Sequence, residues 1–526
     1  MSIATELTRL KQAKNNIKTS IENKGVTVDS AATLDTYNTY IDLISGATQE
    51  NKLNLMLKNQ LTEITAEDTD GVVYIDGFEK KTNLQKITFA DSVYDIASGC
   101  CSGCSSLSSV TFGTSLKKIN ASAFTNTALV DLVLPSGVTY LGNNAFNSCA
   151  SLKSVYAKGK IPSLYNYTFA FCTSLSSFTM DYPESVTTIN SSVFKGCTSL
   201  TAIPLTEMSM TALTTSAFTY CSSLTRCSKN KYVEDGWFVA PTSLTRINAQ
   251  AFCGCSGITD VSLSENCTGV TTYAFSGSGV QNFYFFKHTY PTFDSTTLKA
   301  PSGVTCYVPI DGLSSYTRYK FASAYTSQIK INPYAAPSGQ TVYLRIKNLY
   351  QASTIKVVNN GTSFYNAISS MIVNGTSVTK SPTVSLAAGD SIIMLNLSAS
   401  SINMEYAFGG CGNVDEIYIG DGITVTGTEE MFKDCGRISN IVFGSGCSAF
   451  SDSTFDAQAQ EPFTLTLHSP TVVDCFSNTT FAGDSMDAEI HLVVPVSLAQ
   501  SYAEGGSLWQ ELYDNYTLYI EPRIIE

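Results

Sequence analysis

One spacing recurs along this chain and limits what it can fold into. An aliphatic residue is followed by Phe five positions later, by Cys three positions after that, and by a second aliphatic residue three positions further on. Six units keep this register and a closing unit keeps only its Phe, with Phe-to-Phe steps of 22, 23, 25, 24, 34 and 23 residues. A unit with so few apolar positions cannot enclose a core alone, so it is stable only when stacked on its neighbours. The spacing therefore predicts a β-rich solenoid with repeats of about 23 residues. Its Phe residues are Phe124, Phe146, Phe169, Phe194, Phe218, Phe252 and Phe275.

The recurring cysteines are predicted to be core residues. Cys is small and readily buried, so it can present the same volume in every unit of a stacked column. The closely spaced cysteines at 100–104 and 253–255 belong to the repeat, and no His lies near them in the sequence. No Cys pair has zinc spacing to a second pair. We expect reduced, structural cysteines and neither a metal nor a cofactor.

The repeats form two arrays. The first spans 69–290, with an insertion of about ten residues near 228–240 that is expected to be a loop; the second, shorter array spans 401–456 around Phe408, Phe432 and Phe455. Each array is followed by a strand, a Pro, a helix-like stretch and a further strand, at 291–334 and 457–526. These segments are predicted to be caps that cover the open end of a solenoid. The segment 335–400 has hairpin signals at Asn360 and Asn374 and is either a small β-domain or a leading cap.

The repeat pattern LxxVxxxxxVTxIxxxAFxxCxSL resembles the BspA-type leucine-rich repeat family. The resemblance covers roughly residues 84–290 and, less closely, 400–456. It implies a curved leucine-rich repeat solenoid and a surface-exposed binding or adhesion protein without catalysis. It implies a class of protein and not a particular ligand.

Residues 1–68 differ from the repeats and are predicted to be α-helical. A first stripe of apolar residues has Lys14 at its one skipped position, which disfavours a trimeric coiled coil. Second and third helices are expected over about 34–44 and 49–63. The segment is interpreted either as an anchoring or oligomerisation element or as a helical cap for the solenoid. The apolar positions are Ile3, Leu7, Leu10, Ile17 and Ile21, then Leu34, Tyr37, Ile41 and Ile44, then Leu53, Leu57 and Leu61.

The stretch LTRLKQAKNNIKTSIENKGVTVDSAATLDTYNTYIDLI resembles the N-terminal segment of tail and baseplate-associated phage proteins. The resemblance implies a virion tail fibre or receptor-binding component, docked to other tail or baseplate proteins through these helices and presenting the repeats to a bacterial surface protein or glycan. Such a protein would be assembled in the host cytoplasm. This fits an N-terminus without a secretory signal and a chain without a membrane-spanning stretch. The alternatives are a cellular BspA-like adhesin and a virion decoration or scaffold protein.

Composition and motifs exclude several functions. The net charge is −12 and no run of Lys or Arg occurs, so a nucleic-acid partner is not expected. The three His residues, His288, His468 and His491, have no neighbouring triad partners, and no phosphate-binding loop occurs, so catalysis is not expected.

Two aromatic groups are candidate sugar-binding sites. One is the cluster at 283–290 and the other lies in the insertion. The first group has an alternative interpretation, because rings at the end of an array are expected to form the core of its cap. Neither group is assigned as a site. The residues are Phe283, Tyr284, Phe285, Phe286 and Tyr290, then Tyr232, Trp237 and Phe238.

Overall fold

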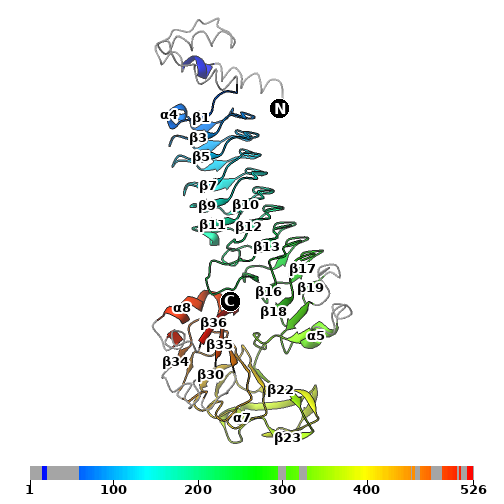
Figure 1. The fold of residues 1–526 in the computed structure, drawn as a ribbon. Helices are drawn as coiled ribbons and strands as arrows, with labels where there is room; N and C mark the ends of the chain where they lie inside the picture. The colour runs from blue at the N-terminus through cyan, green and yellow to red at the C-terminus, as the bar shows by residue number, and fades with distance from the viewer. Residues whose placement is uncertain are drawn as a thin grey trace.

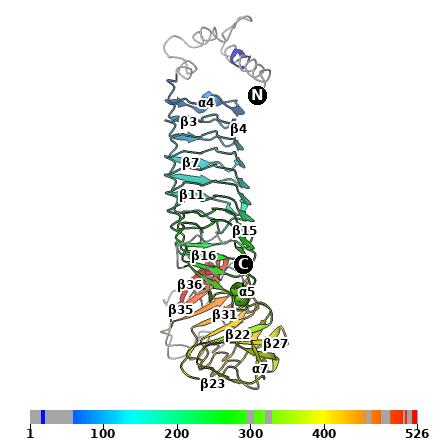
Figure 2. The same cartoon turned by 90° about the vertical axis from the view of Figure 1, so that its right-hand side faces the viewer.

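The computed structural model describes residues 15–19, 59–293, 304–318, 329–451, 453–455, 462–475, 489–505, 509–510 and 518–524. They form two stacks of β-rungs (Figure 1). The first stack is long and narrow, and the second lies at its C-terminal end (Figure 2). The β-solenoid predicted from the repeat is confirmed.

Most rungs of the first array contribute two short strands, each parallel to its counterpart in the next rung, and a tight turn; at Ala202 and Arg226 the first strand is reduced to isolated bridges. The second strands form one ten-stranded sheet in which aliphatic residues of neighbouring rungs are in register, for example Ile119, Leu141 and Leu164. Its strands are β2 (Tyr74–Ile75), β4 (Asp95–Ile96), β6 (Lys118–Ile119), β8 (Tyr140–Leu141), β10 (Ser163–Leu164), β12 (Thr188–Ile189), β13 (Ala212–Leu213), β15 (Arg246–Ile247), β17 (Gly269–Val270) and β19 (Thr292–Phe293).

The first strands of the rungs form three smaller sheets along another side of the array. They are β1 (Glu63–Ile64), β3 (Lys86–Thr88) and β5 (Ser109–Thr111); β7 (Asp131–Leu134), β9 (Ser154–Ala157) and β11 (Ser177–Met180); and β14 (Trp237–Val239), β16 (Asp260–Leu263), β18 (Asn282–Phe285), β20 (Thr305–Val308) and β21 (Ile329–Ile331). Short helices are α4 (Ala66–Thr69), the 3-10 turn η2 (Pro183–Ser185) and α5 (Leu313–Arg318).

The recurring Phe side chains stack directly on one another. Their ring centroids lie 5.4 Å apart between Phe124 and Phe146, and 5.3 Å apart between Phe194 and Phe218, with nearly parallel planes. The recurring Cys side chains are buried behind them. Each thiol donates a hydrogen bond to the backbone carbonyl of the preceding rung's Phe, as Cys197 does to Phe169 at 3.1 Å. The column predicted as core packing therefore also links neighbouring rungs, because each of these carbonyls accepts from a thiol of the next rung as well as from a backbone amide of its own turn, as Phe169 does from Cys172 at 3.3 Å.

Each turn places two residues, four positions apart, in the left-handed backbone region. Asn, Ser and Gly predominate at these positions, as expected for residues that tolerate positive φ. The exceptions are Tyr, Phe and Gln side chains in four of the turns. The pairs are Gly99 and Gly103, Ser122 and Asn126, Asn144 and Ser148, Tyr167 and Phe171, Ser192 and Gly196, Ser216 and Tyr220, Gln250 and Gly254, and Tyr273 and Gly277.

The first array begins earlier than predicted. Leu61, assigned to a third helix, is buried in the core of the array, and β1 follows at Glu63 in parallel register with β3. Leu61 and Ile64 have the spacing of a helix face, but they also stand one repeat of 23 residues before Leu84 and Ile87, which they extend as a further rung. Of the other predicted helices, the structure describes residues 15–19, which are helical; the rest lies outside the described residues.

The second module is built on a nine-stranded sheet that includes the segment 335–400. Strand β22 pairs antiparallel with β27 on one side and with β29 of the second array on the other, so this segment is a leading cap that shares the sheet. In order the sheet holds β25 (Thr376–Val378), β24 (Ile368–Val373), β27 (Gly389–Leu397), β22 (Thr341–Leu349), β29 (Glu416–Ile419), β31 (Asn440–Phe443), β33 (Phe463–Leu467), β35 (Ile490–Pro495) and β36 (Leu518–Ile524).

Short strand pairs and helices complete this module. The pairs are β23 (Ser353–Lys356) with β26 (Thr383–Leu386), β28 (Ser401–Asn403) with β30 (Thr424–Gly427), and β32 (Ala449–Phe450) with β34 (Asp474–Cys475). The helices are α7 (Ser363–Ala367), the 3-10 turn η4 (Val496–Leu498) and α8 (Ala499–Glu504).

The two closing segments have the same design. In the first, β20 and β21 are parallel neighbours with α5 between them in sequence; in the second, β35 and β36 are parallel neighbours with η4 and α8 between them. Tyr316 on α5 and Tyr502 on α8 are both fully buried. A cap of this form replaces the missing next rung by a helix and one further strand.

Candidate functional site

The aromatic cluster at 283–290 is a packing element. Phe283 and Phe285 belong to the core of the first array. Tyr284 and Phe286 point to the opposite side of β18 and pack against Trp237 and Val239. Both faces of this strand are therefore covered, and the rings of residues 283–286 are not available for a sugar. Tyr290 is partly buried and packs edge-on against Tyr316, with ring centroids 5.7 Å apart.

The insertion at 228–240 connects the two modules. The expectation of a loop is wrong for its last part, because Trp237 and Phe238 lie in β14, which pairs with β16. The side-chain amide of Asn230 donates to the carbonyl of Val496 at 2.7 Å. Lys231 forms an ion pair with Glu504 at 2.6 Å, and the hydroxyl of Tyr232 donates to the same carboxylate at 3.2 Å. In both views α8 and β36 accordingly lie beside the end of the first array (Figures 1 and 2).

The outer faces of two sheets cover each other at this junction. Strands of the free rungs alternate between exposed and buried residues, as β7 and β9 do. Strands β29 and β31 are buried at every position, and β18 at all but its first. A cluster of Ile310, Ile331, Ala336, Tyr343, Tyr418 and Val442 joins the modules. The junction therefore removes from solvent the sheet face that the earlier rungs leave open.

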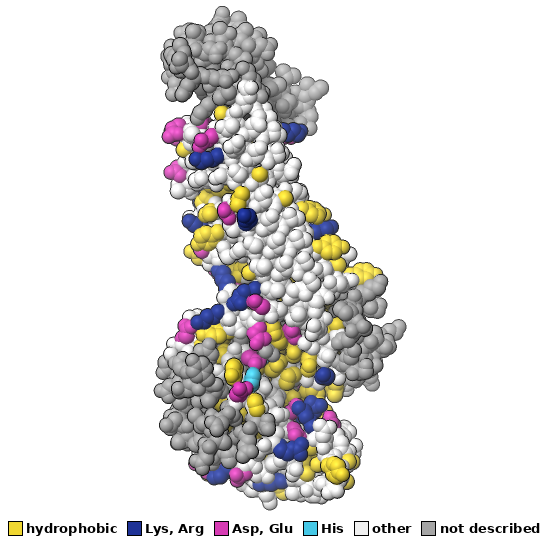
Figure 3. All heavy atoms as spheres, viewed as in Figure 1, with side chains coloured by type: hydrophobic (Ala, Val, Ile, Leu, Met, Phe, Trp, Pro, Cys, Tyr) yellow, Lys and Arg dark blue, Asp and Glu magenta, His cyan; other side chains and the backbone are white. Residues whose placement is uncertain are grey.

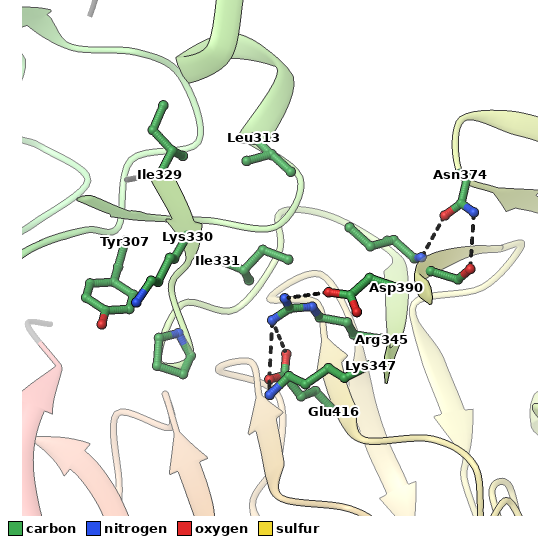
Figure 4. A pocket seen from close by; sticks show the side chains of 13 residues that line it. Tyr307, Leu313, Ile329, Lys330, Ile331, Arg345, Lys347, Asn374, Asp390 and Glu416 are labelled. Atoms are coloured by element: carbon green, nitrogen blue, oxygen red, sulfur yellow. Dashed lines mark hydrogen bonds and ion pairs between the residues drawn. The ribbon is translucent and has the colours of Figure 1, made fainter. Parts of the chain in front are cut away.

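A cluster of four charged side chains lies in a cavity of about 500 Å³ between the modules (Figure 4). Arg345 on β22 contacts Asp390 at 3.5 Å and Glu416 at 3.2 Å. Lys347 forms an ion pair with Glu416, whose carboxylate also accepts a hydrogen bond from Tyr418 at 2.7 Å. These residues come from strands far apart in the sequence, so no local motif could have identified them.

The cavity is better suited to holding strands together than to chemistry. Arg345, Lys347, Asp390 and Glu416 neutralise one another. On the facing wall, Lys330 lies over the ring of Tyr307 at 5.8 Å and has no carboxylate partner among the described residues. No nucleophile is present beside a base in this lining, so the arrangement offers one cation to a small anion and no catalytic pair.

The three His residues have structural partners. His288 and Asp311 are 2.7 Å apart; burial alone would lower the pKa of His288, but this contact outweighs it and raises the pKa. His468 is half-buried and donates from Nε2 to the carbonyl of Tyr334 at 2.7 Å. Burial lowers the pKa of His468. His491 pairs with Glu521 at 2.7 Å.

The cysteines and acidic residues offer no metal site in the part of the chain that is described. No group of three or more His, Cys, Asp or Glu side chains gathers there. Every cysteine is a free thiol, and burial raises the pKa of Cys197 to about 12. No helix among the described residues is long and apolar enough to cross a bilayer.

Comparison with known proteins agrees with this architecture. A family model described as the BspA type leucine rich repeat region matches residues 72–182, 158–238, 179–300, 236–336 and 343–462. It begins at residue 72, so it does not support the phage resemblance of the N-terminal segment. No curated protein matches the chain.

Several solved structures resemble the chain. A leucine rich cell surface protein from Faecalibacterium prausnitzii is 26% identical, with 44% of this chain and 67% of that chain covered and a TM-score of 0.29. The T. pallidum leucine rich repeat protein is 23% identical, with 27% and 72% covered and a TM-score of 0.20. The pneumococcal vaccine antigen PcpA is 14% identical, with 52% and 83% covered and a TM-score of 0.27. Because the family model matches more than half of its residues, the chain belongs to the BspA-type leucine-rich repeat family.

Proposed function

We propose that this protein is a non-enzymatic binding protein of the adhesin type, displayed at a cell surface. The observation that carries the proposal is that the apolar, thiol and His side chains of the solenoid have structural roles. Apolar and thiol side chains are buried between stacked rungs, and the His residues and the charged residues at the junction are paired in structural contacts. What remains is a long, rigid outer surface of stacked rungs, which is suited to binding a large ligand.

The sheet face over β3, β5, β7, β9 and β11 and the turns beyond the ten-stranded sheet are the surfaces open to such a ligand. Their exposed residues are mostly Ser, Thr and Asn, in keeping with a chain in which only 14% of residues are charged. A bacterial or host surface protein or glycan is the expected partner class.

The alternative is a virion component, either a tail fibre or a decoration protein, held by residues 1–68 to tail or baseplate proteins. Its support is the resemblance of the N-terminal 40 residues, which lie almost wholly outside the described part. One experiment tests both the cell-surface proposal and the virion alternative. It is quantitative proteomics of a source culture that has been separated into purified DNA-containing particles, cell envelope and soluble fractions.

Enrichment with intact cell envelope, together with cleavage of the chain by protease added to whole cells, is the expected result. Enrichment in particles at a fixed ratio to a capsid protein would overturn the cell-surface proposal in favour of the virion. Recovery in the soluble fraction alone would overturn both.

A further inference from the structure

Three aromatic side chains of the first array combine exposure with an unfavourable backbone conformation. Tyr167, Phe171 and Tyr220 have φ values of 57°, 58° and 63°. Their side chains are 38%, 44% and 57% exposed. Bulky residues rarely adopt positive φ, because it brings their side chains too close to the backbone, so each of these residues is held in a strained conformation. Neither the core nor the turn requires these rings. Other rungs place Asn126, Ser148 or Gly277 at the position of Phe171 and Tyr220, and Ser122 or Asn144 at that of Tyr167.

Two of the rings lie flat on a glycine of the next rung. A Cβ atom on Gly196 would stand 2.8 Å from Cδ1 of Phe171, and one on Gly254 would stand 2.6 Å from Cδ1 of Tyr220. The contacts of the two pairs are nearly the same, so both rings are held in one orientation over backbone. An aromatic residue thus alternates with glycine along the column Phe171, Gly196, Tyr220, Gly254.

The column is rigid and its repeat distance follows from its hydrogen bonds. The amide of Phe171 donates to the carbonyl of Lys195 at 2.7 Å, and that of Tyr220 donates to the carbonyl of Cys253 at 2.7 Å. Rungs bonded in this way stand about 5 Å apart, so rings on alternate rungs stand about 10 Å apart. Two linked hexose rings span a similar length.

The surface around the rings is polar and almost uncharged. The turns at 143–150, 166–173, 191–198, 215–222 and 248–256 contain one charged residue, Lys195. Asn143 and Asn166 use their side-chain oxygens to accept from the amides of Asn166 and Ser191. Their amide nitrogens have no partner within the described ranges and are free to donate. Figure 3 shows hydrophobic side chains standing singly on a largely white surface along the right-hand edge of the array.

We infer that Tyr167, Phe171 and Tyr220, here called the ring row, form a binding site for a neutral polysaccharide. The apolar faces of its sugar rings stack on the aromatic rings, and its hydroxyl groups accept hydrogen bonds from the free amides of Asn143 and Asn166. A protein partner fits less well, because a stable protein interface needs a contiguous patch and these rings are separated by polar turns. The inference rests on the proposed function, since it names the ligand class of a surface-binding protein.

The test uses the full chain and a panel of soluble neutral polysaccharides: a β-1,4-glucan, a xylan, a mannan and amylopectin. Native gel electrophoresis with each polymer in the gel measures retardation. The site variant is Phe171→Asn with Tyr220→Asn, which introduces a residue that another rung already holds at this position and that tolerates positive φ. The control is Tyr350→Asn, because Tyr350 is 95% exposed in the second module.

We expect at least one polymer to retard the wild type and the control equally, and the site variant to bind it at least tenfold more weakly while keeping its thermal midpoint. No retardation by any polymer, or equal retardation of wild type and site variant, overturns the inference.

A second measurement distinguishes an incorrect glycan inference from an incorrect proposal of cell-surface adhesion. Purified protein is bound to cells pretreated either with periodate, which oxidises glycans, or with protease. Loss of binding after periodate supports the ring row as a glycan site if the site variant also fails to bind untreated cells. Loss after protease alone overturns the glycan inference and leaves surface adhesion standing.

Discussion

The thiol of Cys197 donates a hydrogen bond to the backbone carbonyl of Phe169, 3.1 Å away in the preceding rung. Cys149, Cys172, Cys221 and Cys255 make the same contact to their preceding rungs. The thiol thus fills space in the core and gives the carbonyl of Phe169 a second hydrogen bond, beside the one that it accepts from the backbone amide of Cys172 at 3.3 Å.

Replacing Cys197 by Ala removes both contributions. We expect the free energy of unfolding to fall by roughly 1–2 kcal/mol, from the loss of one buried hydrogen bond and of the packed side-chain volume, while the carbonyl of Phe169 keeps its bond to the amide of Cys172. Cys197→Ser should cost less, because its hydroxyl can donate to the same oxygen. Urea unfolding followed by circular dichroism measures both; equal losses for Ala and Ser would contradict a role for the hydrogen bond.

The buried thiols also predict a response to alkali. Burial raises the pKa of Cys197, Cys306 and Cys435 to about 12, whereas the pKa of a thiol in the unfolded chain is near its ordinary value of 9.0. Their contribution to stability is complete below about pH 9 and is lost as pH rises towards 12. The midpoint temperature of thermal unfolding should therefore decrease as the pH is raised from 9 to 11.

The thiols should also differ in reactivity. In the native protein at pH 8, mass spectrometry should find Cys253 and Cys475 alkylated before the fully buried thiols.

Gly196 is required by the ring of Phe171. Gly196→Ala places Cβ 2.8 Å from Cδ1 of Phe171 at a φ of +75°, so we expect a loss of about 2 kcal/mol from strain and displacement together. Gly277→Ala is the matched control, because its φ is +65° and the nearest atom is 4.0 Å away. Thermal unfolding compares the two. Equal losses would mean that the ring does not occupy the space above Gly196.

Glu416 anchors the charged cluster between the modules. It is 4% exposed and accepts from Arg345, Lys347 and Tyr418. Glu416→Gln leaves Lys347 without its carboxylate, so we expect a loss of about 3 kcal/mol in the unfolding of the second module. Glu79→Gln, which removes an exposed ion pair with Lys80, should change stability by less than about 0.5 kcal/mol. Similar losses for both variants would contradict the role of the buried cluster.

The junction contains two His residues whose protonation has opposite consequences. Burial holds the pKa of His468 below its ordinary value of 6.5, so the contribution of this side chain to stability is complete above pH 6.5 and is lost as the pH falls. The pKa of His288 is raised by Asp311 despite burial, so its contribution is present below pH 6.5 and is lost as pH rises through the higher folded value. The carboxylates of Asp421 and Glu265 also face this region.

Two variants separate these effects. When the pH is lowered from 7 to 5, the free energy of unfolding of His468→Gln should decrease less than that of the wild type, because Gln can donate to the carbonyl of Tyr334 and does not titrate. His288→Gln should lose more over the same range. Urea midpoints at each pH measure the difference, and parallel pH profiles for the two variants would exclude this account.

The repeat could be predicted from the sequence because its determinants are local and periodic. Phe194, Cys197 and Leu200 recur at intervals typical of a stacked repeat, and each meets the same residue type one rung away. Leu61 was assigned to a helix because a spacing of three suits a helix face as well as a rung, and its partner Leu84 lies a full repeat away. The phage resemblance of the N-terminal segment stays a prediction.

The sequence by itself determined the stacking of rungs, the burial of the Phe and Cys columns, and the two caps. Only the tertiary structure showed that the insertion and the rings at 283–286 pack at a junction between the modules. The sequence could not show this, because the junction is made by residues far apart in the chain, such as Asn230 and Val496, which are 266 positions apart. The tertiary structure also decided which aromatics stay exposed. Tyr220 resembles any other turn residue in the sequence, and its exposure depends on a glycine that the fold brings beneath it one rung later. Local periodicity determines what stacks, whereas contacts between distant segments determine which surface is left for a ligand.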